Sequence, residues 1–217
     1  MTKNQENTVP KLRVHHLTLS VDGYAAGPRQ RLEAPFGDGI DGLHDWMFAA
    51  MRDRANGRTG VDVDRLDLGE ENIGATIMGR NMFGPVRGPW QDETWTGWWG
   101  DTPPYRHPVF VHTHHQRAAL SMEGGTTFHF TDEPIETVLQ RAFEAAAGKD
   151  VRIGGGPATI RQYLRAGLVD QLHLVIAPIL VGRGERLFDG MGDALDGYRV
   201  VEQISSAAAT HISLARR

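Results

Sequence analysis

The sequence contains no cysteine. Without cysteine the chain has no disulfide scaffold, no iron–sulfur cluster, no thiolate zinc site and no cysteine nucleophile, and this composition is typical of a cytoplasmic protein. Long apolar runs are also missing. None approaches the ~20 residues that a membrane-spanning helix needs, and the first residues lack the apolar core of a secretory signal. We therefore expect a cytoplasmic protein that does not bind membranes.

An excess of positive charge is missing as well. Lys and Arg number 23 against 27 Asp and Glu, so the formal net charge at pH 7 is -4. A protein that binds nucleic acid by neutralising phosphates is usually basic, so we expect no nucleic-acid partner. The 217 residues are enough for one domain with a sizeable core. We expect a flexible leader over residues 1–11 and a single domain over residues 12–217.

The sequence does contain a succession of apolar segments with two different periods. Strand-like patterns predict strands near residues 12–20, 75–78, 108–113, 126–130, 151–153, 170–181, 198–205 and 208–215. Helical spacing predicts helices over residues 40–54, 134–147 and 157–167, whereas residues 56–72 show no strong period. Strands that alternate with helices and then give way to strands predict an α/β fold with a mixed, mainly parallel central sheet flanked by helices.

A run of three glycines is the strongest local signal. In VRIGGGPATIRQYL, the glycines at 154–156 join a predicted strand to a predicted helix that has Pro157 at its first position. Bare backbone next to the positive end of a helix suits a phosphate group. The run is not a Walker loop, because no Gly-Lys-Ser/Thr follows, and the third glycine of a Rossmann fingerprint is missing. We favour a phosphate or dinucleotide site over the alternative, a tight turn without a ligand.

Two further strand ends carry polar or cationic residues. Gly79-Arg80-Asn81 follows the strand at 75–78, and His112-Thr113-His114-His115 ends the strand at 108–113, with Arg117 nearby. An arginine offers a fixed fork of donors to phosphate. The second strand end has no acid to select a free ribose 2′-hydroxyl, and its groups suit a 2′-phosphate. If the three strand ends share one cleft, the ligand is NADPH rather than NADH.

These segments resemble a known family. TIMGRNMF and VRIGGGPATIRQYL resemble the corresponding strand–helix junctions of dihydrofolate reductase. GLVDQLHLVIAPILVGRGERLF and LTLSVDGYAAG closely resemble the reductase domain of the bifunctional riboflavin-biosynthesis deaminase–reductase. The resemblance implies a dihydrofolate-reductase-like three-layer fold, an NADPH cofactor, a small heterocyclic substrate and a homodimer. The activity that it implies is reduction of 5-amino-6-(5-phosphoribosylamino)uracil.

The resemblance also implies which residues bind the cofactor. They fall at the nicotinamide end, along the pyrophosphate and adenosine side, around the ribose 2′-phosphate, and in the triple-glycine turn. In that order they are Thr18, Ala25 and Ala26; Gly79, Arg80, Asn81 and Met82; Thr113, His114 and His115; and Gly154, Gly155, Gly156, Pro157, Ala158, Thr159 and Ile160.

The substrate side departs from both relatives. Leu43 stands three residues before Trp46, where dihydrofolate reductase has its pterin-binding acid, and Gly154 stands where the riboflavin-pathway reductase has an acid. No catalytic residue is assigned, and the candidates are Asp22, Asp45 and Glu185. Two alternative functions stay open. One is a non-catalytic nucleotide-binding module on the same fold, and the other is a divergent dihydrofolate reductase that uses Asp45 or Asp41.

Tryptophans and histidines form the remaining clusters. Trp90, Trp95, Trp98 and Trp99 lie in one long loop, which we interpret as a lid over a flat substrate or as a dimer contact. The ten histidines include His15-His16 and the group at 112–115. Neither group has the spacing of a known zinc motif, so we predict no metal site.

Overall fold

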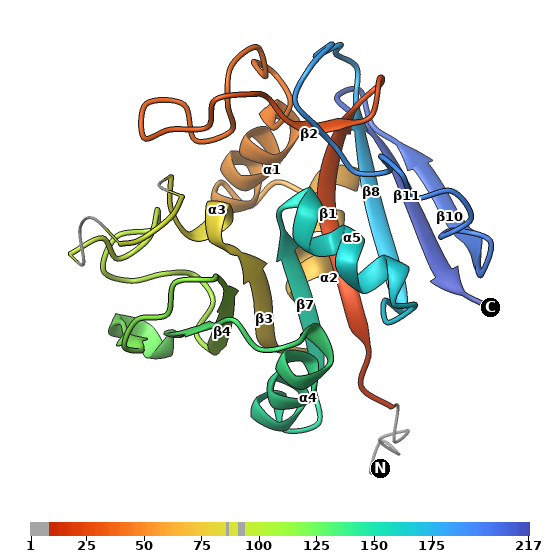
Figure 1. The fold of residues 1–217 in the computed structure, drawn as a ribbon. Helices are drawn as coiled ribbons and strands as arrows, with labels where there is room; N and C mark the ends of the chain where they lie inside the picture. The colour runs from red at the N-terminus through yellow and green to blue at the C-terminus, as the bar shows by residue number, and fades with distance from the viewer. Residues whose placement is uncertain (1–8, 86, 91–93) are drawn as a thin grey trace, which may run out of the picture.

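The computed structural model describes residues 9–85, 87–90 and 94–217, in which one large sheet runs through the molecule (Figure 1). Its nine strands lie in the order β10-β11-β8-β1-β7-β3-β4-β6-β5. Their bounds are β1 (Leu12–Ser20), β3 (Ile73–Gly79), β4 (Pro108–His112), β5 (Leu120–Ser121), β6 (Thr127–Thr131), β7 (Asp150–Gly155), β8 (Gln171–Ala177), β10 (Tyr198–Ser205) and β11 (Thr210–Arg216). A separate small pair joins β2 (Tyr24–Ala26) to β9 (Glu185–Arg186).

The centre of the sheet is parallel and its edges are antiparallel. β1 pairs in parallel with β7 and β8, and β3 pairs in parallel with β7 and β4. At one side β11 runs antiparallel to β8 and β10, and at the other β5 runs antiparallel to β6. Every residue of β3 is buried, as expected for a parallel strand that is covered on both faces. The predicted mixed, mainly parallel sheet is therefore confirmed.

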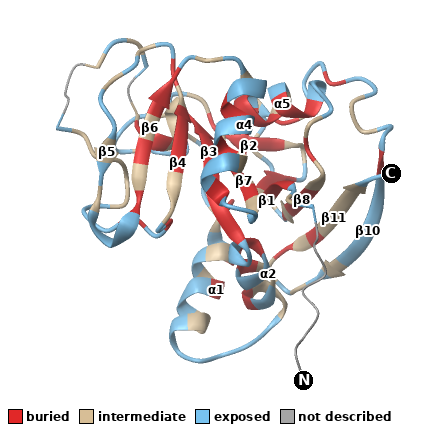
Figure 2. Cartoon of the chain, turned by 90° about the horizontal axis from the view of Figure 1, so that it is seen from below, coloured by how far each residue is buried: buried red, intermediate tan, exposed pale blue. Residues whose placement is uncertain are grey.

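Helices cover both faces of the sheet (Figure 2). α1 (Asp45–Ala55) and α2 (Val61–Glu70) lie on one face, and α4 (Ile135–Ala146) and α5 (Pro157–Arg165) lie on the other. The core beneath α4 and α5 includes Val138, Leu139 and Ile160, while a separate core beneath α1 and α2 includes Trp46 and Leu66. Among the described residues, no helix has the length and apolar character that crossing a membrane requires.

Two helix predictions need correction. The helix expected at 40–54 begins at Asp45, because Gly42 has a φ of 83° and breaks the first turn. α2 forms where no element was expected. Its buried residues Val63, Leu66 and Gly69 are spaced three apart and face the sheet, so tertiary packing selects a helix that the polar sequence only weakly signals.

The tryptophan-rich loop packs against its own chain. Trp90, Trp95 and Trp99 join an apolar cluster with Phe83 and Phe128, next to the short helix α3 (Arg80–Phe83) and the 3-10 turn η1 (Glu123–Gly125). Trp95 Nε1 donates a hydrogen bond to the Phe83 carbonyl at 3.0 Å. Residues 91–93 of the predicted loop lie outside the described residues. These three tryptophans therefore stabilise the fold, a role that neither interpretation of the loop included.

Candidate active site

The three strand ends selected from the sequence lie along one edge of the sheet. β7, β3 and β4 are neighbours and run in parallel, so their carboxyl ends meet at the same edge. A Cβ atom added to Gly79 would lie 2.3 Å from Thr159 Oγ1 and 3.6 Å from the Gly156 nitrogen. The end of β3 is therefore packed directly against the start of α5, and only a residue without a side chain fits there.

The triple-glycine turn presents an open backbone surface. Gly155 has a φ of 127°, which glycine adopts readily, and the peptide bond between Gly155 and Gly156 is cis. A Cβ atom added to Gly156 would meet nothing within 4 Å. This backbone precedes α5, whose first helical residue is Pro157. The turn thus offers bare backbone at a helix N-terminus, as a phosphate-binding turn requires.

Gly154 of β7 packs beside Met82 of α3. A Cβ atom at this position would lie 3.1 Å from Met82 Cε and 3.2 Å from Met82 Sδ. A side chain at Gly154 would therefore require the end of the Met82 side chain to shift.

Arg80 directly follows β3 and contacts the turn after β4. Its Nη1 donates to Thr113 Oγ1 at 3.3 Å, and its guanidinium carbon lies 3.0 Å from the centroid of the Trp90 ring. Burial, with a further contribution from the nearby Arg117, lowers the pKa of Arg80 to about 10. Within the described residues no carboxylate forms an ion pair with Arg80, and its buried Nε has no hydrogen-bond partner. Such a guanidinium is suited to binding an anion.

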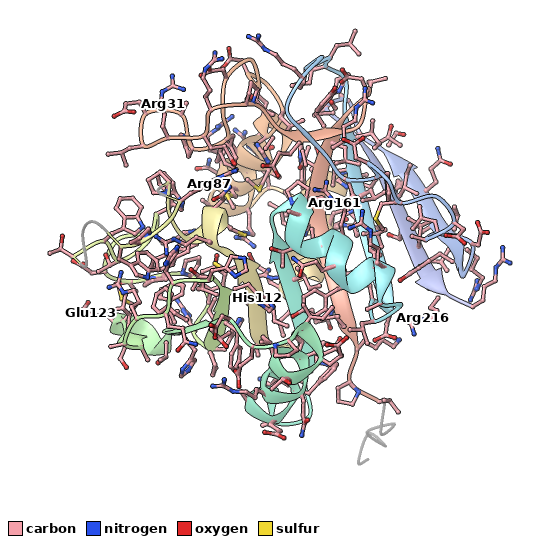
Figure 3. All side chains as sticks on the ribbon, in the orientation of Figure 1. Arg31, Arg87, His112, Glu123, Arg161 and Arg216 are labelled. Atoms are coloured by element: carbon pink, nitrogen blue, oxygen red, sulfur yellow. The ribbon has the colours of Figure 1, made fainter. Side chains whose placement is uncertain are left out.

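The turn after β4 is fixed by its own hydrogen bonds. Thr113 Oγ1 accepts from the His115 backbone N–H at 3.1 Å, and Trp90 Nε1 donates to the His115 carbonyl at 2.7 Å. His114 is exposed at the tip. His112 instead points toward α5 (Figure 3), where its Nε2 lies 2.7 Å from the Tyr163 hydroxyl. Residues 113–115, predicted to bind the 2′-phosphate, thus lie beside Arg80. Thr113 contacts Arg80 directly, and Trp90 contacts both Arg80 and His115.

The residues expected at the nicotinamide end lie on and just after β1. Thr18 is buried on β1, the strand next to β7, and its Oγ1 accepts a hydrogen bond from Trp46 Nε1 at 3.0 Å. Ala25 and Ala26 are buried in β2. Asn81, by contrast, contacts Gln30 through side-chain atoms 3.2 Å apart. The structure therefore places these residues, and their role in cofactor binding stays a prediction.

The three catalytic candidates are dispersed. Asp22 accepts hydrogen bonds from Ser20 Oγ at 2.6 Å and from the Gly182 N–H at 2.7 Å, and these bonds lower its pKa to about 2. This geometry is that of a residue that holds a turn. Glu185 forms an ion pair with Arg87 at 3.1 Å near the surface. Asp45 differs from both, because it lines a pocket.

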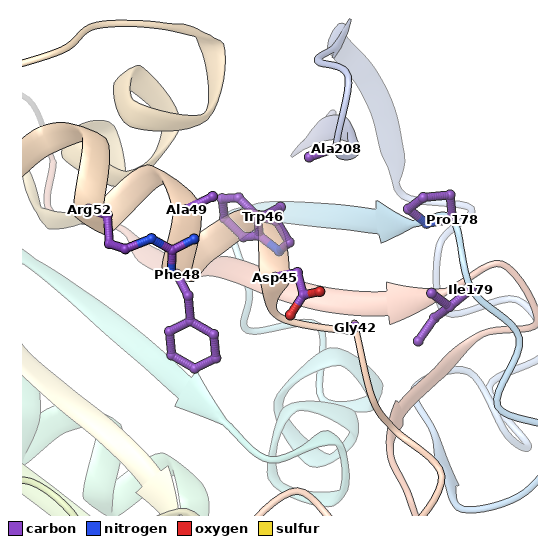
Figure 4. Close-up of a pocket in the computed structure, with 9 residues that line it drawn as sticks. All are labelled: Gly42, Asp45, Trp46, Phe48, Ala49, Arg52, Pro178, Ile179 and Ala208. Carbon is purple, nitrogen blue, oxygen red and sulfur yellow. The ribbon is translucent and has the colours of Figure 1, made fainter.

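That pocket, with a volume of about 580 Å³, runs along α1 (Figure 4). Its polar side chains are Asp45 and Arg52, its aromatic side chains are Trp46 and Phe48, and it extends to the segment after β8. The complete lining is Gly42, Asp45, Trp46, Phe48, Ala49, Arg52, Pro178, Ile179 and Ala208. The volume is in the range of small-molecule sites. Sequence reasoning missed this pocket, although the spacing of Asp45, Ala49 and Arg52 places them on one face of α1.

Comparison with known proteins agrees with this architecture. A model of the RibD C-terminal domain family matches residues 11–202. A protein from Shewanella sp. PV-4, whose name assigns it to riboflavin biosynthesis, superposes with a TM-score of 0.58 at 19% identity, over 95% of this chain and 99% of that one. A search of curated proteins found no match.

Two enzymes share the fold. The diaminohydroxyphosphoribosylaminopyrimidine deaminase/5-amino-6-(5-phosphoribosylamino)uracil reductase of Thermotoga maritima has a TM-score of 0.57 and 14% identity, over 96% of this chain and 57% of that one. Dihydrofolate reductase from Enterococcus faecalis, solved with NADP(H) and RAB-propyl, has a TM-score of 0.52 and 13% identity, over 95% of this chain and 96% of that one. The dihydrofolate-reductase-like fold is therefore confirmed. Because the family model covers most of the sequence, the chain belongs to the RibD C-terminal domain family.

Proposed function

We propose that the chain is an NADPH-dependent reductase that transfers a hydride to a small heterocyclic substrate. The proposal rests on the environment of Arg80. Its guanidinium is partly desolvated and contacts Trp90 and Thr113. Among the residues that the structure describes, no carboxylate forms an ion pair with it. A phosphate beside it would raise its lowered pKa again, because an opposite charge favours the charged form. Membership of the family supports the reductase activity.

The residues present fit NADPH. The open backbone at Gly155 and Gly156 suits the pyrophosphate, and Arg80 with Thr113 suits a phosphate on the ribose 2′ position. No acid stands at the end of β4 to prefer the free hydroxyl of NADH. When bound, NADPH supplies the hydride, and the protein supplies binding and orientation.

The pocket along α1 is the proposed substrate site. The Asp45 carboxylate can accept hydrogen bonds from the amino and ring N–H groups of an aminopyrimidine, and the Arg52 guanidinium can pair with a phosphate. 5-Amino-6-(5-phosphoribosylamino)uracil carries both groups. Reduction of its ribose carbonyl takes up one hydride and one proton, and it leaves a ribityl chain and NADP⁺. Assembly as a homodimer and a leader over residues 1–11 remain predictions from the sequence.

Calorimetric titration of the purified chain with NADPH and NADH in parallel tests the cofactor. We expect clear preference for NADPH. Arg80→Gln should reduce this preference at least about tenfold, since a charged hydrogen bond contributes about 1.5–3 kcal/mol. Arg58→Gln removes an exposed arginine that pairs with Asp53, so it controls for net charge and should change neither affinity. Binding of neither nucleotide would refute the cofactor assignment.

Turnover separates the candidate functions. The loss of NADPH absorbance is followed with 5-amino-6-(5-phosphoribosylamino)uracil and, separately, with dihydrofolate. Oxidation that depends on the pyrimidine supports the proposal. Oxidation that depends on dihydrofolate identifies a divergent dihydrofolate reductase instead. Tight NADPH binding without turnover of any carbonyl or imine substrate identifies a nucleotide-binding module.

A further inference from the structure

Two consecutive histidines of β1 lie on the same side of the strand. In a regular strand His15 and His16 would point to opposite faces. Here the register between β1 and β8 shifts between Val14 and Leu17, and His16 has a φ of 58°. This irregularity has the character of a β-bulge, which re-aims a side chain. As a result the His15 and His16 ring centroids are 5.4 Å apart.

His173 of β8 completes a cluster of three imidazoles. Its ring centroid lies 5.1 Å from that of His15 and 5.7 Å from that of His16. One ring nitrogen of each residue lies within 4.8 Å of one ring nitrogen of the others. His173 is 2% exposed. A Cβ atom at Gly69 of α2 would lie 2.1 Å from His16 Cε1, so the helix provides the space for this ring by having no side chain there.

The surrounding hydrogen bonds orient two of the rings. His16 Nε2 lies 2.7 Å from the Arg65 carbonyl, which only accepts, so Nε2 carries the proton and Nδ1 the lone pair. His211 Nε2 lies 2.7 Å from the Asp62 carboxylate, and His211 Nδ1 lies 3.2 Å from His173 Nε2. Because the Asp62 carboxylate accepts, Nε2 of a neutral His211 ring carries the proton and its Nδ1 accepts. His173 Nε2 therefore donates to His211, and the lone pair of His173 falls on Nδ1.

The outer contact of His16 is that of a metal-binding histidine, and the outer contact of His173 reaches the Asp62 carboxylate through His211. Such a histidine typically donates its second ring N–H to a carbonyl or carboxylate, which fixes the tautomer. The buried Nδ1 of His173 has no hydrogen-bond partner among the described residues.

We propose that His15, His16 and His173 form a binding site for one divalent transition-metal ion, with Zn²⁺ as the favoured ion. Imidazole suits Zn²⁺, which needs four ligands in a tetrahedral arrangement, and a water molecule would take the fourth position. The ion would tie β1 to β8 beneath α2. This inference is independent of the proposed reductase activity.

Three nearby arginines, Arg13, Arg65 and Arg152, oppose the binding by their positive charge, and Arg13 is the one whose guanidinium contacts a ring directly. Its Nη2 lies 3.0 Å from His15 Nε2, and since a guanidinium only donates, His15 Nδ1 carries a proton when no metal is bound. Coordination through Nδ1 therefore requires Arg13 to separate from this ring. Nη1 of Arg13 pairs with Asp150 at 3.2 Å, and Nη2 also donates to the Leu68 carbonyl at 2.7 Å, so the guanidinium has other partners when it leaves the ring. We therefore expect weaker binding than at a three-histidine site without a neighbouring cation.

The sequence could not show this site. The prediction of no metal rested on the absence of a known spacing, and His173 is far from the pair in sequence. The bulge that turns His15 and His16 together arises from strand pairing, which the local pattern does not reveal. An alternative occupant of the same space is a buried water, which the test distinguishes from a metal.

The test uses the whole chain after treatment with EDTA and dialysis. Calorimetric titration with ZnCl2 should show one ion bound per chain, and the ion should raise the melting temperature. His16→Gln and His173→Gln should each weaken binding at least about tenfold. His129→Gln, in β6 and outside the cluster, is the matched control and should bind like the unaltered chain.

A spectroscopic measurement on the unaltered chain covers the case in which the variants do not fold. Co²⁺ should give the intense visible absorption of a four-coordinate ion, and Zn²⁺ should abolish it. The proposal is overturned by the absence of one-to-one binding, by a weak spectrum of six-coordinate Co²⁺, or by folded variants that bind Zn²⁺ as tightly as the control. Either of the first two results would leave a buried water as the occupant.

Discussion

The guanidinium of Arg80 lies against the ring of Trp90, with the guanidinium carbon 3.0 Å from the ring centroid. The two residues come from different segments, because Arg80 begins α3 and Trp90 lies in the loop beyond it. Trp90 is fixed in turn by its hydrogen bond to the His115 carbonyl. The tryptophan therefore positions the cation at the end of β3, where the proposed phosphate contact is made.

Replacing this ring should weaken binding of the phosphorylated cofactor. We expect Trp90→Leu to reduce NADPH affinity by a factor of about 2 to 30, since a cation–π contact contributes about 0.5–2 kcal/mol. NADH affinity should change less, because NADH has no 2′-phosphate. Calorimetric titration with both nucleotides measures the difference. An equal loss for both, with an unchanged melting temperature, would contradict a positioning role toward the 2′-phosphate.

Asp22 should prove structural. Its lowered pKa of about 2 means that it is ionised at pH 7 and has no proton to donate. Its carboxylate accepts from Ser20, Val181 and Gly182 and so joins the turn after β1 to the segment after β8. We expect Asp22→Asn to lower the melting temperature while kcat changes by no more than about threefold. A fall in kcat of about a hundredfold, with cofactor and substrate affinities retained, would identify Asp22 as catalytic.

His44 should make the protein less stable in mild acid. It precedes α1, its ring centroid lies 4.2 Å from that of Phe36, and burial lowers its pKa to about 4, partly offset by Asp45. The unfolded chain therefore binds a proton below about pH 6.5 that the folded chain does not, so stability falls as pH decreases from 7 toward 4. Between pH 7 and 5 the loss from this residue is on the order of 2 kcal/mol.

The measurement is urea unfolding at both pH values, for the unaltered chain and for His44→Gln. The variant has no ring to titrate, so its stability should fall less over the same interval. Other buried histidines contribute equally to the pH dependence of both chains. The difference between the two stability losses therefore reports His44 alone. Equal slopes in the two chains would show that His44 is not the origin of the effect.

Local signals were sufficient to predict three strand ends that lie along one edge of the sheet. Gly79, Arg80 and the triple glycine each occur where a strand meets a helix, and parallel strands place such junctions along one edge. The features that were missed depend on partners distant in sequence. α2 is stabilised by the sheet beneath it, and the pocket needs Pro178 and Ala208 to close around α1. Those partners cannot be identified from the period of a single segment.

Asp45 and Arg52 provide the sharpest test of the substrate site. Both line the pocket along α1, and neither belongs to the predicted cofactor residues. We expect Asp45→Asn and Arg52→Gln each to raise KM for 5-amino-6-(5-phosphoribosylamino)uracil about 10- to 100-fold, because each loses a charged hydrogen bond of about 1.5–3 kcal/mol. NADPH affinity should stay unchanged. Asp53→Asn alters an exposed acid of the same helix outside the pocket lining, and it should keep the KM of the unaltered chain. If both variants instead weaken NADPH binding and leave KM unchanged, the pocket belongs to the cofactor and the substrate binds elsewhere.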